Sequence, residues 1–572
     1  MTLAHTDERR WWKEAVVYQV YPRSFNDTTG SGSGDLPGIT EKLDYLADLG
    51  VDVVWLSPVY DSPMNDNGYD IRDYRAIADL FGTMADFDAM LAGMHERGIR
   101  LMMDLVVNHT SSEHVWFQQS RQSKDNPYRD YYHWHPPAED GGPPTNWRAF
   151  FGGSAWTFDE ATGEYYLHLF DETQPDLNWT TPAVRAEVYD LMRFWLEKGV
   201  DGFRMDVIPF ISKPPFEDVS DPETYNLHRF YANGPRVHEY LQEMHQRVLA
   251  TYDVMTVGEG QGIKPEEALL YAGADRDELQ SFFYFDHVQV GRAEDDWNRP
   301  VDWTLPEFKA AITEWDHAFG ERAWPSVFLG NHDFPRAVSI FGDDRPDYRE
   351  RSAKMLATLL LTLRGTPYIY QGDEIGMTNA LFETLDDFED LNTINDVYEK
   401  VAAGEDRETV LDQHRRISRD HARTPMQWDA SEHAGFTDGT PWLMVNPNHD
   451  VINVDRAWEK PDSIFHYYRR LIELRRERDV LVYGRYELLL PDHPAVFVYR
   501  RILGNEEAMV SLNFTTKKQK MPVPDKLEDA VFTHVLGNYE QAPPMTDPLL
   551  LRPYEGRVDG RIDQEDGNRA AE

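Results

Sequence analysis

The chain has 572 residues, 41% of them hydrophobic and 13% aromatic, which is enough for a large core and for two or three domains. Its 100 Asp and Glu against 57 Lys and Arg give a net charge of −43, which disfavours nucleic acid and anionic membranes as partners because both are polyanions. The absence of cysteine excludes disulfides, thiolate metal sites and a cysteine nucleophile.

The distribution of apolar and charged residues also bears on location. No apolar run approaches the roughly 18 residues that a membrane span needs, and residues 1–13 carry charges without an apolar signal region. We therefore expect a cytoplasmic protein, either a monomer or a small homo-oligomer. Acidic residues spread along the chain with few lysines suit a protein kept soluble in high salt, a hypothesis about habitat.

Short apolar runs recur along the chain, each followed by a loop rich in Gly, Asp, Asn or Pro and then by a helical pattern. The runs cover residues 16–21, 51–57, 99–107, 200–206, 254–259, 282–285, 326–330 and 366–370. Eight such strand and helix units predict an α/β fold, a (β/α)8 TIM barrel over residues 1–109 and 179–478.

Two connections are too long for a single strand and helix unit. Residues 110–178 are aromatic and rich in loops, which predicts a small inserted domain after strand three. Residues 375–447 form a long loop or subdomain after strand eight. We expect it to lie over the same end of the barrel as the inserted domain.

The last part of the chain changes pattern. After a helix at 463–477, alternating segments predict a C-terminal antiparallel β-sandwich over residues 479–556. The polar residues 557–572 predict a disordered tail.

The carboxyl ends of the predicted strands carry acids, and the active sites of such barrels lie at this rim. Strand four ends in Arg204-Met205-Asp206, and strand alternation places Arg204 and Asp206 on one face. The guanidinium would keep Asp206 ionised, although a purely structural ion pair gives the same pattern. Strand five ends in Glu259, and Asp333 follows strand seven, so carboxylates from separate strands would converge.

A pair of carboxylates in one cleft is what a retaining glycosidase requires. Asp206, beside its arginine, would be the nucleophile. Glu259, with no cation near it in the sequence, would be first the acid and then the base. Asp333 would favour the positively charged ring of the transition state. His109 and His332 would donate to sugar hydroxyls, unless each is a loop-packing residue.

Several sequence motifs resemble those of a known enzyme family. Asp104-Leu105-Val106-Val107-Asn108-His109, Gly202-Phe203-Arg204-Met205-Asp206, Gly258-Glu259 and Asn331-His332-Asp333 resemble the four signature regions of the α-amylase superfamily, glycoside hydrolase family 13. Gln174-Pro175-Asp176-Leu177-Asn178-Trp179 and Arg423-Thr424-Pro425-Met426-Gln427-Trp428 are similar to its oligo-1,6-glucosidase and α-glucosidase subfamily. The resemblance implies the catalytic roles argued above, with no cofactor required for the chemistry.

The resemblance also implies a pocket closed at one end, suited to a small oligosaccharide or disaccharide. Asp66 would pair with Arg419, with Arg423 as the alternative, to grip the terminal glucose. Aromatic and amide side chains would surround that glucose: Tyr69, Phe151, Phe170 and Gln174. Without the resemblance, these aromatics would be assigned to the core.

The resemblance also bears on which linkage the enzyme prefers. The residue that matters is the one directly after the nucleophile. In similar enzymes a valine there accompanies α-1,6 preference, and here it is Val207. Two departures face the acceptor side: Gly260-Gln261-Gly262 follows Glu259, where relatives usually carry a methionine next to the acid, and Phe334 follows Asp333, where a glutamine is common. They leave open an α-1,4-glucosidase, a sucrose isomerase or a transglucosylase with the same carboxylates. A non-catalytic relative of transporter heavy chains is disfavoured, because the three acids are present and no span is predicted.

A glycine-rich loop at residues 27–35 resembles the calcium loop of relatives. Acidic or amide ligands are replaced there by Thr29 and Ser31, so only Asp27 and Asp35 supply charge. Two interpretations follow, a turn without metal and a weak structural Ca²⁺ site.

Overall fold

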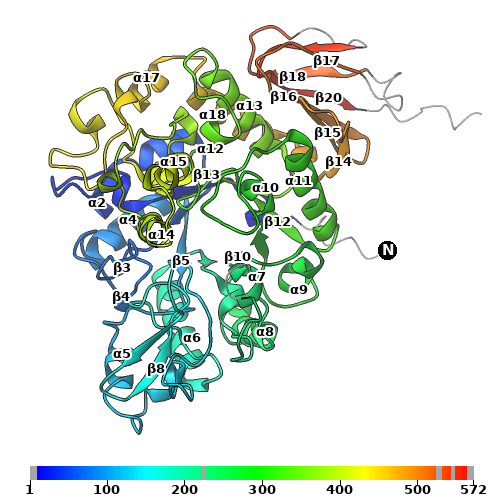
Figure 1. Ribbon diagram of the computed structural model, residues 1–572. Coiled ribbons are helices and arrows are strands. Elements are labelled where there is room, and N and C mark those ends of the chain that lie inside the picture. The colour runs from blue at the N-terminus through cyan, green and yellow to red at the C-terminus, as the bar shows by residue number, and fades with distance from the viewer. Residues whose placement is uncertain (1–8, 222–225, 523–530, 543–547, 563–572) are drawn as a thin grey trace, which may run out of the picture.

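The computed structural model describes residues 9–221, 226–522, 531–542 and 548–562. Eight parallel strands form a closed barrel in the order β1-β13-β12-β11-β10-β9-β5-β2 (Figure 1). Their bounds are β1 (Val17–Val20), β2 (Val53–Leu56), β5 (Arg100–Leu105), β9 (Gly202–Met205), β10 (Met255–Glu259), β11 (Ser281–Phe283), β12 (Trp324–Val327) and β13 (Thr366–Tyr370). Each of the eight predicted runs supplies one of these strands, so the predicted TIM barrel is confirmed.

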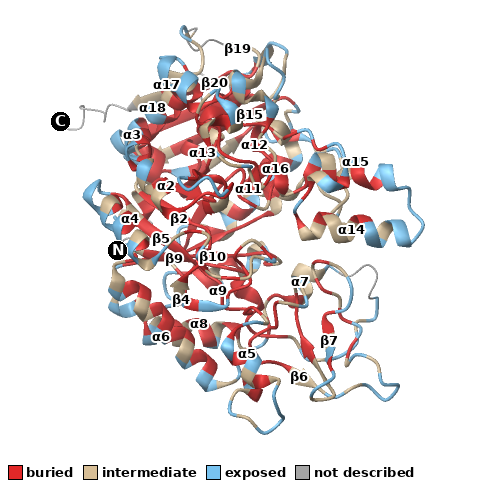
Figure 2. Cartoon of the chain, turned by 90° about the vertical axis from the view of Figure 1, so that its left-hand side faces the viewer, coloured by how far each residue is buried: buried red, intermediate tan, exposed pale blue. Residues whose placement is uncertain are grey.

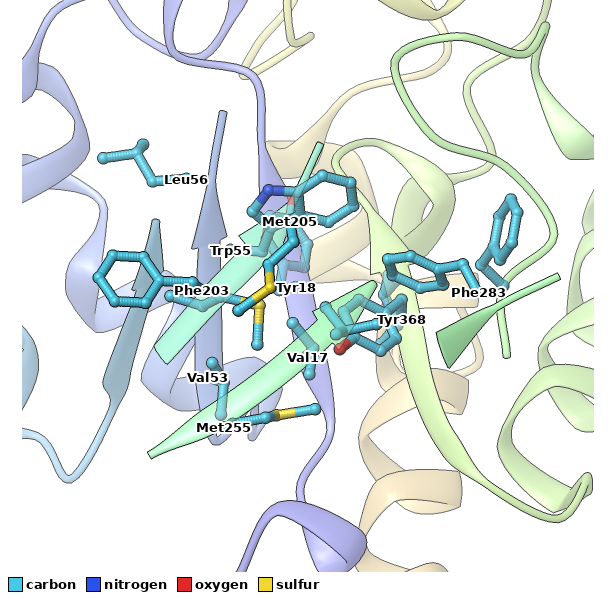
Figure 3. Close-up of a cluster of buried hydrophobic side chains, with 14 of the residues drawn as sticks. Val17, Tyr18, Val53, Trp55, Leu56, Phe203, Met205, Met255, Phe283 and Tyr368 are labelled. Carbon is cyan, nitrogen blue, oxygen red and sulfur yellow. The ribbon is translucent and has the colours of Figure 1, made fainter. Parts of the chain in front are cut away.

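Bulky side chains from different strands fill the centre of the barrel, and Figure 3 shows Trp55, Phe283 and Tyr368 among them. Trp55 and Phe283 lie with ring centroids 5.8 Å apart, and Phe283 and Tyr368 4.6 Å apart. The barrel is therefore a packed core, and the strand ends are held on a rigid scaffold.

Helices surround the barrel (Figure 1). The longest, α6, begins with Pro182 at its first turn and ends before Gly199, whose φ of +105° suits glycine. It feeds the chain directly into β9. The helices outside the long connection after β13 are α1 (Trp11–Glu14), α2 (Leu36–Glu41), α3 (Leu43–Leu49), α4 (Met84–Glu96), α5 (Val115–Ser120), α6 (Pro182–Lys198), α7 (Leu227–Tyr231), α8 (Val237–Arg247), α9 (Ala268–Ala272), α10 (Asp286–Gln289), α11 (Leu305–Phe319), α12 (Ala337–Ile340), α13 (Arg349–Thr362), α18 (Ile464–Glu477) and α19 (Asp479–Tyr483).

The segment after β5 carries α5 and a three-stranded sheet of β6 (Trp134–His135), β8 (Glu164–Leu167) and β7 (Trp156–Asp159). A buried ion pair ties this segment to the barrel: Lys213 Nζ lies 2.5 Å from Asp176 Oδ2 and donates to Asn108 Oδ1 at 2.6 Å. The antiparallel hairpin of β3 (Tyr60–Asp61) and β4 (Asp73–Ile77) lies nearby, after β2. Between its strands lie Asp66 and Tyr69.

The connection after β13 contains helices α14 (Leu391–Ala402), α15 (Arg407–Ile417), α16 (Asp420–Arg423) and α17 (Val454–Glu459). The pair α14 and α15 projects from the body of the molecule in Figure 2. Asn395 on α14 donates to the carbonyl of Phe151 at 2.9 Å, so this pair reaches the segment inserted after β5.

The C-terminal region is antiparallel. One sheet has the order β14-β15-β16-β20-β18, and β17 pairs with β19. The bounds are β14 (Arg485–Leu489), β15 (Val496–Leu503), β16 (Glu506–Asn513), β17 (Gln519–Met521), β18 (Thr533–Gly537), β19 (Leu549–Leu551) and β20 (Gly556–Ile562).

The predicted disorder from residue 557 is wrong for residues 557–562. They belong to β20, which pairs with both β16 and β18. The polar composition suggested disorder, but these charged residues pair with one another in the folded sheet. Arg557 donates to Asp559 at 2.7 Å, and both side chains are buried. Residues 563–572 lie outside the described residues.

Candidate active site

One buried guanidinium lies beneath the carboxyl ends of β5, β9 and β10. Arg204, 1% exposed, donates from Nη1 to Asp104 Oδ1 at 2.5 Å and to Asp206 Oδ1 at 2.6 Å. Its Nη2 lies 2.6 Å from Glu259 Oε2. We call Asp104, Arg204, Asp206 and Glu259 the floor cluster. The fold therefore brings to Glu259 a cation that its sequence neighbourhood lacks.

Charge in the floor cluster is unbalanced. Burial raises the pKa of Asp206 and of Glu259, while Arg204 acts in the opposite direction on both. Burial also raises the pKa of Asp104. Because three carboxylates share one positive charge in buried surroundings, the cluster favours holding a proton. Contrary to the expectation from the sequence, Arg204 alone therefore does not keep Asp206 ionised; its ionisation requires that the proton lie on Glu259 or Asp104.

Val207 has an unusual backbone conformation. Its φ is +34°, a strained value for a β-branched residue. In this conformation its N–H donates to Glu259 Oε2 at 2.9 Å. The strained residue thus helps to hold Glu259 beside Asp206.

A second cluster faces the floor and is rich in arginine. Asp333 Oδ1 accepts from Arg419 Nη1 and from Arg423 Nη2, each at 3.1 Å. Arg419 Nη2 also lies 2.5 Å from Asp390 Oδ1. We call Asp333, Asp390, Arg419 and Arg423 the wall cluster.

The wall cluster keeps its acids ionised. Burial alone would raise the pKa of Asp333, but the neighbouring His332, Arg419 and Arg423 hold it well below its ordinary value. Burial likewise opposes ionisation of Asp390, yet Arg419 and Arg423 lower its pKa to about 2. A permanent negative charge therefore faces the cavity at Asp333.

The pairing of Asp66 with Arg419 is looser than the resemblance implied. Arg419 Nη2 lies 3.9 Å from Asp66 Oδ1, whereas its contacts with Asp333 and Asp390 are shorter. Burial raises the pKa of Asp66 to about 7. Gln174 Nε2 donates to its other oxygen at 3.0 Å. Asp66 thus lies at the edge of the wall cluster.

Two histidines are held neutral. Burial lowers the pKa of His332 to about 3 and that of His109 to about 4. Gln19 Nε2 lies 2.8 Å from His332 Nδ1, which assigns the ring proton to Nε2. Tyr69 Oη and Asp333 Oδ2 lie 2.7 and 3.2 Å from that Nε2.

A cavity of about 560 Å³ opens between the two clusters, within the range of small-molecule sites, about 300–1,000 Å³. The predicted residues that line it are Asp66, Tyr69, His109, Phe151, Phe170, Asp206, Val207, Glu259, His332, Asp333 and Arg419. Arg204 and Gln174 lie behind the lining: Arg204 against Asp206 and Glu259, and Gln174 against Asp66 and His109.

Several contributors were not predicted from sequence. Asp390 follows a run of acids in the long connection after β13, where nothing in its spacing distinguishes it. Arg423 was predicted only as an alternative partner of Asp66, and it contacts Asp333 instead. Trp297 and Arg292, which stack at 4.5 Å, line the cavity from the loop before α11. Only the fold places them there.

The residues of the 27–35 loop do not fit a calcium ion. Asp27 Oδ1 accepts from Thr29 and Gly30, and its Oδ2 accepts from Gly32 and Thr437. Asp35 is the N-cap of α2 and accepts from Thr28 and Gly38. N–H and O–H donors therefore occupy the oxygens that a cation would need. No group of three or more acidic, histidine or cysteine residues suited to a metal occurs among the described residues.

Comparison with known proteins now adds to this geometry. A family model described as "Alpha amylase, catalytic domain" matches residues 19–484, and one described as "Maltogenic Amylase, C-terminal domain" matches residues 486–558. The oligo-1,6-glucosidase of Parageobacillus thermoglucosidasius is 55% identical over 560 residues, 96% of this chain and 99% of the relative.

Two solved structures are similar over nearly the whole chain. The isomaltulose synthase of Protaminobacter rubrum has a TM-score of 0.95 at 46% identity and covers 97% of this chain and 100% of its own. The trehalulose synthase of Pseudomonas mesoacidophila MX-45 has a TM-score of 0.94 at 47% identity, with the same coverage.

Proposed function

Since the chain belongs to the α-amylase family of glycoside hydrolases, we propose that it is a retaining α-glucosidase that releases glucose from the non-reducing ends of short α-1,6-linked glucosides. The observation that carries the proposal is the floor cluster, where one guanidinium holds Asp206 and Glu259 side by side. Retaining enzymes need their two carboxyl groups close together, about 5–5.5 Å apart.

The reaction proceeds in two displacements. Asp206 attacks the anomeric carbon as the bond to the leaving oxygen breaks, and Glu259 gives its proton to that oxygen. Water then attacks the glucosyl ester, Glu259 takes a proton from the water, and the Asp206 carboxylate is released. The ionised Asp333 stabilises the positive charge that develops on the sugar ring. These steps use side chains alone and require no cofactor.

Action from chain ends is supported by the wall. Arg419 and its carboxylate partners Asp333 and Asp390 form a network, of which Arg419 and Asp333 line the cavity. Phe151, which packs 5.1 Å from the Arg419 guanidinium, adds an apolar surface to it. We expect this network to block a further sugar beyond a ring bound at Asp206.

The α-1,6 preference is supported by Val207 and by the oligo-1,6-glucosidase relative. We expect a higher kcat/KM for isomaltose than for maltose, and release of α-glucose as the first product. Nuclear magnetic resonance of the fresh product distinguishes the anomers. Faster maltose cleavage would favour the α-1,4-glucosidase alternative, and initial release of β-glucose would overturn the retaining mechanism.

A second candidate is isomerisation of sucrose. It is favoured by the two synthase structures and by Phe334, which lies 5.9 Å from both Phe285 and Trp297 beside the cavity. In this reaction a fructose hydroxyl, rather than water, would intercept the glucosyl ester. Incubation with sucrose separates the two: glucose and fructose indicate hydrolysis, whereas isomaltulose or trehalulose indicates isomerisation.

No helix of the described residues is long and apolar enough to cross a membrane. The cytoplasmic location, the monomeric or small homo-oligomeric state and the high-salt habitat stay predictions. Fractionation of source cells, light scattering, and solubility at low and multimolar salt would test them.

A further inference from the structure

Gln261 lies two residues after Glu259 and touches it. Its Nε2 donates to Glu259 Oε1 at 3.1 Å. Both side chains are buried, with Glu259 2% and Gln261 9% exposed, and both line the cavity. The contact is therefore between two side chains that a bound sugar would meet together.

The two oxygens of Glu259 have different surroundings. Oε2 accepts from the Val207 N–H at 2.9 Å and lies 2.6 Å from Arg204 Nη2, so its lone pairs already face two donors. The only other contact of this carboxyl within the described residues is that of Oε1 with Gln261. The proton that Glu259 must carry as an acid therefore belongs on Oε1.

Two glycines hold Gln261 in this place. A Cβ on Gly260 would lie 2.0 Å from the ring of Phe282, and one on Gly262 would lie 2.1 Å from the carbonyl oxygen of His228. Gly262 also has a φ of +79°. Because the backbone is packed on both sides, the amide of Gln261 has a fixed origin from which to reach Oε1.

We propose that Gln261 is a positioning residue for the acid/base step, whose amide donates to Oε1 while Glu259 is ionised and turns over to accept from Oε1 when it is protonated. A primary amide can do both, because it has a donor and an acceptor at its two ends. Gln261 thus keeps the exchanging proton on the oxygen beside the cavity. This inference rests on the proposed function, in which Glu259 is the acid and then the base.

The test is the pH dependence of kcat/KM for isomaltose in the wild type, Gln261→Leu and Gln261→Glu. The fall of kcat/KM at high pH, which is the alkaline limb of the pH profile, reports loss of the acid's proton in the free enzyme. Gln261→Leu removes the hydrogen bond in both protonation states, but the charge-assisted bond to the ionised carboxylate is the stronger of the two. The ionised form is therefore disfavoured more, and the limb should shift upward by about one pH unit. Gln261→Glu places a like charge beside Oε1 and should shift it further.

Gln289→Leu is the matched control, because Gln289 also lines the cavity but has no hydrogen bond to Glu259 within the described chain. Its alkaline limb should coincide with that of the wild type. If Gln261→Leu does not fold, as judged by thermal melting, Gln261→Ala gives a second variant without the donor. Alkaline limbs that coincide in the wild type and all Gln261 variants would overturn the inference.

Glu259→Gln separates this outcome from failure of the proposed function. Isomaltose hydrolysis that survives in Glu259→Gln would refute the acid/base role itself. Loss of hydrolysis in Glu259→Gln, together with unmoved limbs in the Gln261 variants, would refute only the role of Gln261.

Discussion

The floor and wall clusters are built from the same residue types, yet they differ in charge balance. The floor has three carboxylates around one guanidinium, Arg204. The wall has two guanidinium groups, Arg419 and Arg423, on Asp333 and Asp390. Burial raises the pKa of the floor acids Asp206 and Glu259, whereas the wall acids keep lowered pKa values.

This difference teaches how one cavity can hold acids with opposite tasks. Glu259, which must give and take a proton, needs surroundings short of positive charge, as in the floor. Asp333, which must stay ionised while a cationic ring forms, needs a surplus of positive charge, as in the wall. The number of arginines per carboxylate therefore separates the acid/base from the stabilising acid, whereas the nucleophile Asp206 depends on its direct contact with Arg204 to be ionised.

The largest effect should come from removing the reacting oxygen of the floor. Asp206→Asn keeps the shape of the side chain but provides no nucleophile. We expect kcat/KM for isomaltose to fall on the order of 10⁴-fold or more, with thermal melting near that of the wild type. Asp302→Asn, at an exposed carboxylate 3.9 Å from Arg416, is the control and should keep full activity. Residual turnover within tenfold of the wild type would contradict the assignment of Asp206.

Breaking the charge balance of the floor is the second test. Arg204→Met removes the one cation that contacts Asp206 and Glu259 among the described residues. Removing one partner of a buried pair costs about 3–5 kcal/mol of unfolding free energy. Since the remaining acids would have pKa values above those of the unfolded chain, the loss should grow as pH rises. Urea unfolding at pH 5 and pH 8 measures it.

Arg204→Lys is the matched variant, because it keeps the charge but loses the planar fork. It should be more stable than Arg204→Met at pH 8 while its kcat stays low, because one ammonium cannot orient both acids. Equal stability of the two variants at pH 8 would show that charge is not what the floor requires.

The wall should be more tolerant, because Arg423 remains when Arg419 is removed. Arg419→Met should lower kcat/KM about 10²-fold, the cost of truncating one partner of a buried charge pair. It should also raise the pKa of Asp390 from about 2 towards its ordinary value. Stability that depends on ionised Asp390 is lost as pH falls through its folded pKa, so the variant should unfold at a higher pH than the wild type during acid titration.

Arg416→Met is the control for the wall, since the Arg416 side chain is 59% exposed and its one ion pair among the described residues is a 3.9 Å contact with Asp302. It should leave both kcat/KM and the acid unfolding midpoint unchanged. An Arg419→Met variant that behaved like this control would remove the distinction between wall and floor.

The sequence predicted more of the floor than of the wall for a physical reason. Arg204, Asp206 and Glu259 lie at strand ends, and strand alternation with barrel order is enough to place them together. Arg419 and Asp390 come from the connection after β13, whose helices have no periodic relation to the barrel. Their pairing depends on tertiary packing, which strand patterns do not report, and the resemblance had implied Asp66 as the main partner of Arg419 instead. Polar β20 was missed for a similar reason, because its charges are paired only within the folded sheet.

The smallest predicted effect concerns Val207, which joins the floor to the acceptor side. Val207→Thr keeps the volume and the N–H that donates to Glu259, so kcat on the better substrate should stay within a few-fold. The hydroxyl changes a surface that lines the cavity next to the nucleophile, and such pocket changes are worth about 1–3 kcal/mol. We expect the ratio of kcat/KM for isomaltose to that for maltose to fall about tenfold. Val290→Thr, at another cavity-lining valine, should leave the ratio unchanged. An unchanged ratio in Val207→Thr would indicate that linkage preference is determined by the loop that carries Gln261 or by Phe334.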